Sequence, residues 1–167
     1  MTLRLYFLRH GKAWSRSDWR EDDDLRPLTD AGEALVRAEG RAMKAMGLAP
    51  DVIATSPLAR ARRTAEIVAE ELGMSERLIE DRRLAHGFDA GRLTEIVEGQ
   101  AAVASLMLVG HEPDLSATIA EITGGGRVDF KKGGPGARRR EGLPAGRRHT
   151  GVAAHACPDH GRVTAWK

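Results

Sequence analysis

Short apolar runs alternate with segments of helical spacing along most of this chain, and that alternation limits the folds open to it. The apolar runs have the length of strands: 3–8, 51–55, 78–84 and 105–109. The segments with helical spacing follow them: 30–46, 58–72, 91–103 and 113–122. Strands joined by helices form parallel sheets that are covered on both faces. The sequence therefore predicts an α/β fold, a three-layer α/β/α sandwich with a mainly parallel central sheet.

The helix predicted over 30–46 has clear end signals. It begins after Thr29, whose side chain is suited to cap a helix, and it ends at Gly47. Its spacing places small and apolar side chains on one predicted buried face: Ala31, Ala34, Leu35, Ala38, Ala42 and Met46. The acidic run Glu21–Asp24 precedes this helix and indicates a solvated surface loop. A last strand is predicted near 128–130.

Composition places the chain among ordinary globular proteins. It has 167 residues, 41% apolar and 30% charged, which is enough for one domain with its own core. No apolar run approaches the ~18 residues needed to span a membrane. The first residues lack the pattern of a signal peptide, and the single cysteine, Cys157, excludes an internal disulfide. We therefore expect a cytoplasmic protein with no membrane partner.

Positive charge collects at the C-terminal end. Residues 131–167 hold nine Lys or Arg and two acidic residues, a net +7, whereas residues 1–130 carry −5. Residues 134–162 are rich in Gly, Pro, Arg and His and have no helical or strand period. The histidines around Cys157 match no familiar zinc spacing. The predicted organisation is a domain over 1–133 and an irregular Arg/Gly/Pro-rich tail over 134–167.

Three of the predicted strands are followed by residues suited to phosphate. Arg9 and His10 follow the first strand, Ser56 and Arg60 follow the second, and His111 follows the fourth. The carboxyl ends of parallel strands line one crevice, where ligands bind. Arginine binds phosphate oxygens through its planar fork, and helix N-termini add dipoles and N–H groups. The sequence therefore predicts an anion site at this edge of the sheet.

At this point the chain resembles a known group of enzymes. Arg9-His10-Gly11, Ser56-Pro57 with Arg60, and Gly110-His111 look like the ordered motifs of the histidine phosphatase superfamily, which has the phosphoglycerate mutase-like fold. Two further segments narrow the resemblance to the SixA-type phosphohistidine phosphatases: Arg26-Pro27-Leu28-Thr29 and Leu84-Ala85-His86-Gly87-Phe88-Asp89. The resemblance covers about residues 2–133.

The resemblance implies a metal-independent phosphatase that uses no cofactor. His10 would be the nucleophile and would form a transient phosphohistidine, Arg9 and Arg60 would hold the phosphoryl oxygens, and His111 would stabilise charge in the transition state. Like-charge repulsion from the flanking arginines would lower the pKa of His10 and favour its neutral form. The chain offers further candidates for contacts to phosphate: Gly11, Arg26 and Ser56. Arg26 is equally suited to a salt bridge within the acidic loop.

One departure from the family bears on the substrate. Larger members place a carboxylate after the third strand as proton donor, whereas residues 82–87 here read Arg-Arg-Leu-Ala-His-Gly. Nearby acids are Glu80, Asp81 and Asp89, and His86 is an alternative donor. General acid catalysis contributes ~10²–10⁴-fold, and the P–N bond of phosphohistidine needs little such help. The predicted function is therefore hydrolysis of phosphohistidine on a partner protein.

Other functions remain open from the sequence. A phosphatase for small phosphorylated molecules is the nearest, and a mutase is disfavoured because the chain lacks insertions that would hold a second phosphate. A binder of acidic partners through the Arg-rich tail would show steep salt dependence, with nucleic acid the less favoured partner. A scaffold that binds phosphate without turnover is a further alternative. A one-nucleotide frameshift would give residues 149–161 an apolar, strand-like sequence, so the tail is also consistent with a shifted reading frame.

Overall fold

Four parallel strands form the centre of a six-stranded sheet in this computed structural model, which describes residues 3–100, 102–125, 154–156 and 163–165. The parallel strands are β1 (Arg4–Arg9), β2 (Val52–Thr55), β3 (Leu78–Glu80) and β4 (Ser105–Gly110). Two short antiparallel strands extend the sheet beyond β1: β5 (Ala154–Ala156) and β6 (Val163–Ala165). The order is β3-β2-β4-β1-β5-β6.

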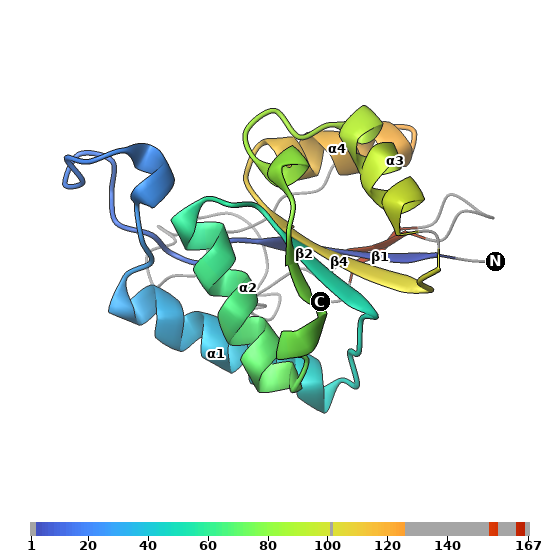
Figure 1. The fold of residues 1–167 in the computed structure, drawn as a ribbon, viewed down its shortest axis with the longest axis horizontal. Coiled ribbons are helices and arrows are strands. Elements are labelled where there is room, and N and C mark those ends of the chain that lie inside the picture. Colours follow the sequence, from blue (N-terminus) through green and yellow to red (C-terminus); the bar gives the residue numbers. More distant parts are fainter. Residues whose placement is uncertain (1–2, 101, 126–153, 157–162, 166–167) are drawn as a thin grey trace, which may run out of the picture.

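Helices cover the sheet on both faces. They are α1 (Asp30–Ala45), α2 (Ala59–Leu72), α3 (Ala90–Gly99) and α4 (Asp114–Ile122). Figure 1 shows α1 and α2 together below the sheet and α3 and α4 together above it. This arrangement confirms the predicted three-layer α/β/α sandwich with a mainly parallel sheet. No helix within the described ranges is long and apolar enough to cross a membrane.

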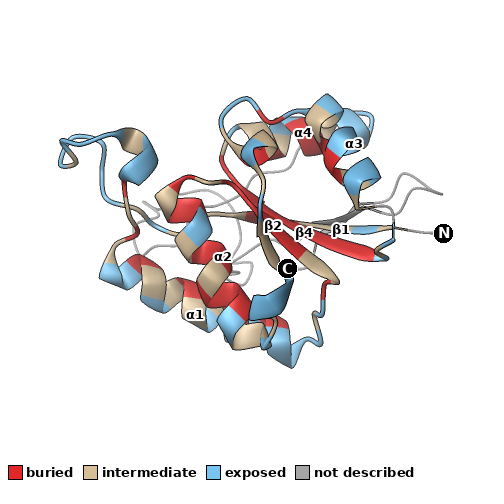
Figure 2. Ribbon diagram, viewed as in Figure 1, coloured by how far each residue is buried: buried red, intermediate tan, exposed pale blue. Residues whose placement is uncertain are grey.

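The core has two halves because successive strand residues point to opposite faces. In β4, whose residues are all buried, Leu106 and Leu108 pack toward α3 and α4, and Met107 and Val109 pack toward α1 and α2. Figure 2 shows this strand buried along its length, at the centre of the sheet. A strand that is covered on both faces is expected to have a continuous apolar sequence, as β4 does.

The face of α1 that is buried differs from the prediction. Of the expected set, residues 31, 34, 38, 42 and 46 are exposed and Leu35 is half-buried. The buried residues of α1 are Gly32, Val36, Gly40 and Met43. Glycine lets α1 approach its neighbours closely, since a Cβ at Gly40 would lie 2.9 Å from Cβ of Glu71 on α2. Close helix contact, and not maximal hydrophobicity, therefore selects this face.

Several predicted boundaries are shorter in the structure. β3 ends at Glu80, and the segment Arg82–Leu84 forms a 3-10 helix capped by Asp81. α3 ends at Gly99, before the predicted limit of 103. The strand predicted near 128–130 and the domain boundary at 133 lie outside the described residues, as does most of the tail. Within the tail, the structure describes β5, which pairs with β1, and β6, which pairs with β5.

Candidate active site

The register of the two central strands brings two histidines together. Arg9 at the end of β1 pairs with Gly110 at the end of β4, and the backbone N–H of His10 donates to the Gly110 carbonyl at 3.1 Å. His10 and His111 follow these paired residues directly. Their ring centroids are 5.2 Å apart. The sheet itself therefore places the two imidazoles side by side, as the sequence predicted.

The geometry of His10 fixes which ring nitrogen is available. Nδ1 lies 2.8 Å from the carbonyl oxygen of Gly11, and because a carbonyl only accepts, Nδ1 carries the proton. Nε2 keeps its lone pair. Burial lowers the pKa of His10 to about 4, the hydrogen bond to Gly11 opposes this effect, and the neighbouring arginines add to the lowering. The imidazole is therefore neutral near pH 7, with burial contributing more than the predicted charge repulsion.

His111 is buried beside His10 and is held by Ser56. Its Nε2 lies 2.8 Å from Oγ of Ser56, which also accepts a hydrogen bond from the backbone N–H of Leu58 at 3.3 Å. Burial, followed by the charge of His10, lowers the pKa of His111 to about 3. Its Nδ1 is buried and has no hydrogen-bond partner among the described residues. Ser56 thus contacts His111.

Two buried arginines, Arg26 and Arg60, bind the carboxylate of Asp23 in the loop between β1 and α1. Arg60 is 2% exposed; its Nη1 donates to the backbone carbonyl of Asp23 at 2.7 Å, and its Nη2 lies 3.2 Å from Oδ2 of the same residue. Arg26 donates from Nε to Oδ1 of Asp23 at 2.8 Å and from Nη1 to the carbonyl of Trp14 at 2.6 Å. The hydrogen bond from Arg26 is the main cause that lowers the pKa of Asp23.

This arrangement corrects one prediction about the acidic run Glu21–Asp24. Asp23 is half-buried, since it binds Arg26 and Arg60 and lies 3.3 Å from the exposed Arg16. The other three acids of the run are exposed, as predicted. No sequence spacing marked it out from its acidic neighbours. Arg26, which was open between a phosphate contact and a loop salt bridge, makes that salt bridge and also lines the pocket described next.

These residues surround a pocket of about 760 Å³ at the carboxyl end of the strands. Its cationic lining residues are Arg9, Lys12, Arg16, Arg26 and Arg60. Its histidines are His10, His86 and His111, and its carboxylates are Asp18 and Glu112. With five cations against two carboxylates, the pocket is suited to an anion. The ring of His86 lies next to that of His111, since the two ring centroids are 5.4 Å apart. His111 therefore contacts both of the other histidines of the pocket.

Two of the residues predicted to contact phosphate, Gly11 and Ser56, are not free to do so in the way that the sequence suggested. Gly11 lines the pocket, but its backbone N–H already donates to Oγ1 of Thr64 at 3.0 Å. Ser56 is fully buried and is absent from the pocket lining in the part of the chain that the structure describes. Arg9, His10, Arg26, Arg60 and His111 all line the pocket. Thr64 was not singled out from sequence, although it lies four residues after Arg60 and so shares its helix face.

The acids near the third strand have other partners. Asp81 accepts two hydrogen bonds from the guanidinium of Arg83, and Asp89 caps α3. Glu80 lies 3.9 Å from Nη1 of Arg62. Between residues 78 and 89, all of which the structure describes, His86 alone lines the pocket. In residues 3–100 and 102–125, no three His, Cys, Asp or Glu side chains are grouped to hold a metal ion.

Comparison with known proteins agrees with this geometry. The model of the histidine phosphatase superfamily (branch 1) matches residues 5–99. An uncharacterized protein of Picosynechococcus sp. is 41% identical over 138 residues, which cover 79% of this chain and 82% of that protein. A 2,3-bisphosphoglycerate-dependent phosphoglycerate mutase of Methylobacterium radiotolerans is 38% identical over 106 residues, 60% of this chain. The match spans about half of that mutase, 48% of its length.

Solved structures share the fold. The putative phosphohistidine phosphatase SixA from Agrobacterium tumefaciens superposes with a TM-score of 0.61 at 28% identity, over 72% of this chain and 76% of that one. The protein histidine phosphatase SixA complexed with tungstate superposes with a TM-score of 0.70 at 21% identity, over 99% and 95% of the two chains. At that identity the second likeness supports the fold alone.

Proposed function

This chain belongs to the histidine phosphatase superfamily, and from that premise we propose that it hydrolyses phosphohistidine on a partner protein through a phosphohistidine intermediate on His10. Membership confirms the predicted enzyme class. The activity that it supports is the one shared by the phosphatases and mutases of the superfamily. The choice of substrate within that class rests on the pocket.

The observation that carries the proposal is a set of three side-chain nitrogen atoms in the pocket residues whose bonding capacity is unused within the part of the chain that the structure describes. His10 offers a neutral Nε2. Nε of Arg60 and Nδ1 of His111 are buried without hydrogen-bond partners among the described residues, and both side chains line the pocket. Buried polar atoms are nearly always paired. Phosphoryl oxygens would pair with these two nitrogens while phosphorus lies near His10.

The proposed reaction has two displacements. In the first, the lone pair on Nε2 of His10 forms a bond to phosphorus as the P–N bond to the substrate imidazole breaks. In the second, water attacks the phosphorylated His10, loses a proton, and releases inorganic phosphate and neutral imidazole. Arg9 and Arg60 hold the phosphoryl oxygens throughout, and positioning with charge stabilisation supplies most of the catalysis in such transfers.

Ser56 and His111 have linked roles in this proposal. When the hydroxyl of Ser56 donates to Nε2 of His111, the proton of His111 resides on Nδ1. Nδ1 then donates to a phosphoryl oxygen as charge develops there. Ser56 therefore acts through His111, and Arg26 acts at the pocket wall, where its charge adds to those of Arg9 and Arg60.

Phosphohistidine is favoured over esters by the proton requirement. A phosphorylated imidazole with a proton on its other nitrogen leaves as neutral imidazole, so no proton donor is needed. An alkyl ester leaves as an alkoxide and needs one. The segment after β3 supplies only His86 to the pocket, and its acids are committed elsewhere. The name of the SixA neighbour from Agrobacterium tumefaciens, at 28% identity, points the same way.

A phosphatase for small phosphorylated molecules is the second candidate. His86, Asp18 and Glu112 line the pocket and are able to carry a proton to a leaving alkoxide. The mutase relative is named for a small phosphorylated substrate. This candidate predicts that p-nitrophenyl phosphate and small phosphate esters are hydrolysed at least as fast as phosphohistidine.

One experiment separates the two candidates. Phosphate release is measured in EDTA from a protein carrying phosphohistidine, from the alkyl ester glycerol phosphate and from p-nitrophenyl phosphate, with the chain and with His10→Ala. We expect fast release from phosphohistidine, much slower release from the alkyl ester, whose alkoxide needs a proton, and none from the variant. p-Nitrophenyl phosphate, whose phenolate leaves without a donor, shows whether the pocket admits a small ester at all. Equal or faster turnover of the alkyl ester would favour the small-molecule phosphatase. Folded protein that turns over none of these substrates would contradict both.

A further inference from the structure

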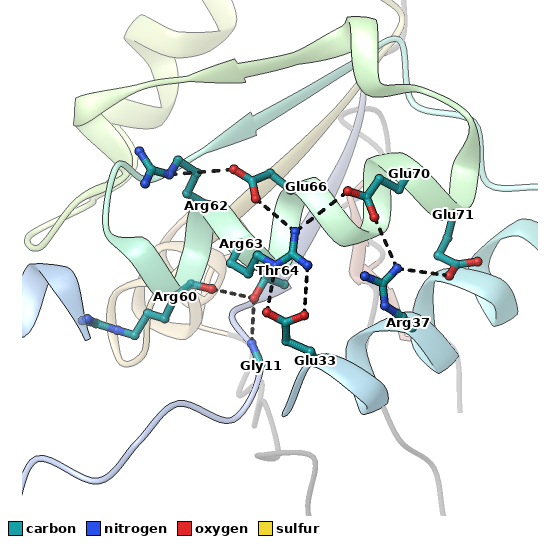
Figure 3. Close-up of polar contacts among 10 residues, drawn as sticks. All are labelled: Gly11, Glu33, Arg37, Arg60, Arg62, Arg63, Thr64, Glu66, Glu70 and Glu71. Atoms are coloured by element: carbon teal, nitrogen blue, oxygen red, sulfur yellow. Dashed lines mark hydrogen bonds and ion pairs between the residues drawn. The ribbon is translucent and has the colours of Figure 1, made fainter. Parts of the chain in front are cut away.

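Thr64 joins the helix that carries Arg60 to the residue that follows His10. It lies on α2, is 1% exposed, and its hydroxyl makes two hydrogen bonds. The hydroxyl donates to the carbonyl of Arg60 at 2.7 Å and accepts from the backbone N–H of Gly11 at 3.0 Å. Figure 3 shows Thr64 between the two. Since a carbonyl only accepts and an N–H only donates, both directions are fixed.

The same path continues to the nucleophile. The carbonyl of Gly11 accepts from Nδ1 of His10 at 2.8 Å. Three hydrogen bonds in series therefore connect the first turn of α2 to the imidazole. The last of these bonds decides the tautomer, because it keeps the proton on Nδ1 and leaves Nε2 unprotonated.

Gly11 needs this support because glycine has the widest backbone freedom of any residue. Val36 holds it from one side, since a Cβ at Gly11 would lie 2.5 Å from Cγ2 of Val36. Thr64 holds its N–H from another. The Gly11 N–H and the Gly11 carbonyl lie in two successive peptides, joined at the Gly11 Cα. Without an acceptor for that N–H, φ and ψ of Gly11 are less restricted, and the Gly11 carbonyl can turn away from Nδ1.

We propose that Thr64 is a positioning residue, whose hydroxyl orients Gly11 so that His10 keeps its proton on Nδ1 and presents Nε2 to the pocket. This inference rests on the proposed role of His10 as nucleophile. It also explains why one hydroxyl bonds to both α2 and the end of β1. Through its hydroxyl, Thr64 fixes the backbone of Arg60 relative to the backbone that follows His10.

A purely structural role makes a different prediction. Threonine hydroxyls within helices commonly bond to the carbonyl four residues back, and that bond alone would satisfy the side chain. In that case, removing the hydroxyl would lower stability without changing the His10 tautomer. The distinguishing readout is therefore the imidazole itself.

The test compares Thr64→Val, which keeps the shape and removes the hydroxyl, with Thr64→Ser, which keeps the hydroxyl. Arg63→Gln is the matched control, because Arg63 directly precedes Thr64 on α2 and its partners are Glu33, Glu66 and Glu70 (Figure 3). The ¹⁵N chemical shifts of the His10 ring nitrogens report the tautomer without substrate. Steady-state kinetics with a substrate that the wild-type chain hydrolyses give kcat and KM.

We expect Thr64→Val to convert His10 to a mixture of tautomers and to lower kcat by about 10- to 100-fold, with KM within threefold. Thr64→Ser and Arg63→Gln keep the wild-type tautomer and kcat. An unchanged tautomer in Thr64→Val would overturn the inference, whatever happens to melting temperature. If Thr64→Val does not fold, Thr64→Cys makes the same comparison, because a thiol of similar size is a weak acceptor.

The two proposals fail in different ways. If the proposed phosphatase function is wrong, the wild-type chain is inactive, yet the tautomer of His10 still responds to Thr64→Val. If the inference on Thr64 is wrong, the wild-type chain is active and the tautomer does not respond.

Discussion

The carboxylate of Asp23 lies 3.2 Å from Nη2 of Arg60, while the backbone carbonyl of Asp23 accepts a hydrogen bond from Nη1 of the same guanidinium at 2.7 Å. Asp23 belongs to the loop between β1 and α1, and Arg60 to the first turn of α2. The long loop between β1 and α1 therefore orients the buried guanidinium that we propose to bind phosphate. The charge of that loop residue becomes part of the site.

Asp23→Ala tests this dependence. Arg60 and Arg26 lose their shared acceptor and repel each other, so both guanidiniums are less well ordered. We expect inorganic phosphate to bind about tenfold more weakly and the free energy of unfolding to fall by about 1–3 kcal/mol, as when a buried polar group loses its partner. Calorimetric titration and urea unfolding measure the two effects. Glu21→Ala, an exposed acid of the same loop, is the control. Tighter phosphate binding by Asp23→Ala would mean that Asp23 competes with the ligand instead.

His86→Ala tests the proton requirement of the leaving group. His86 is exposed and lines the pocket, with its ring tilted against that of His111 at 5.4 Å between centroids. A phosphorylated imidazole, however, leaves without a donor. We expect the rate of phosphohistidine hydrolysis to change by less than about threefold, whereas loss of a general acid costs ~10²–10⁴-fold. Single-turnover kinetics with a phosphohistidine protein provide the measurement. A fall of 100-fold or more would identify His86 as the proton donor.

The lowered pKa values of His10 and His111 make stability depend on pH. Both imidazoles are neutral in the folded chain down to pH values of about 4 and about 3, whereas in the unfolded chain they take up protons below about 6.5. The unfolded state therefore binds more protons in this window. The free energy of unfolding should fall as pH drops from about 6.5 to about 4, by about 1.4 kcal/mol per pH unit for each histidine.

Urea unfolding of the wild-type chain and of His10→Gln across pH 4.5–7 checks this expectation. Glutamine does not titrate, so the variant should lose up to half of the pH dependence that the two histidines contribute. Because the other titrating groups are present in both proteins, the difference between the two curves isolates His10. Identical slopes would show that His10 is not held neutral by the fold.

Gly11→Ala tests the close contact with α1. The added methyl would lie 2.5 Å from Cγ2 of Val36, so either Val36 or the residue after the proposed nucleophile must move. We expect kcat to fall by 100-fold or more. The double variant with Val36→Ala should recover part of that loss, although Val36→Ala itself costs about 2 kcal/mol of stability. A double-mutant cycle on kcat measures the coupling, and additive effects would exclude a steric origin.

The fold was largely predictable because its signals are local. Thr29 and Gly47 mark the two ends of the first helix, and the alternation of apolar runs with helical segments predicts the parallel sheet. His10 and His111 were predictable because residues after parallel strands meet at one edge. The buried face of α1 was not, because Gly32 and Gly40 are chosen for close approach and not for hydrophobicity.

The supporting residues of the site were harder to predict for a physical reason. Asp23 is one acid among several in a loop, and only the folded path of that loop shows which of them meets Arg60. Thr64 bonds to Gly11 across 53 residues, a contact that no local pattern encodes. Ser56 was assigned to phosphate because it follows the second strand, and its actual contact with His111 depends on the pairing of β2 with β4.

The pairing of β1 with β4 sets the spacing of the two imidazoles independently of every loop around them. The backbone bond from His10 to Gly110 and the register of Arg9 with Gly110 belong to the sheet. The walls of the pocket, in contrast, come from residues 12–29 and from His86. Residues can therefore be gained or lost in those walls during evolution while the reacting centre stays intact, so new substrates become accessible to this fold without reinventing its chemistry.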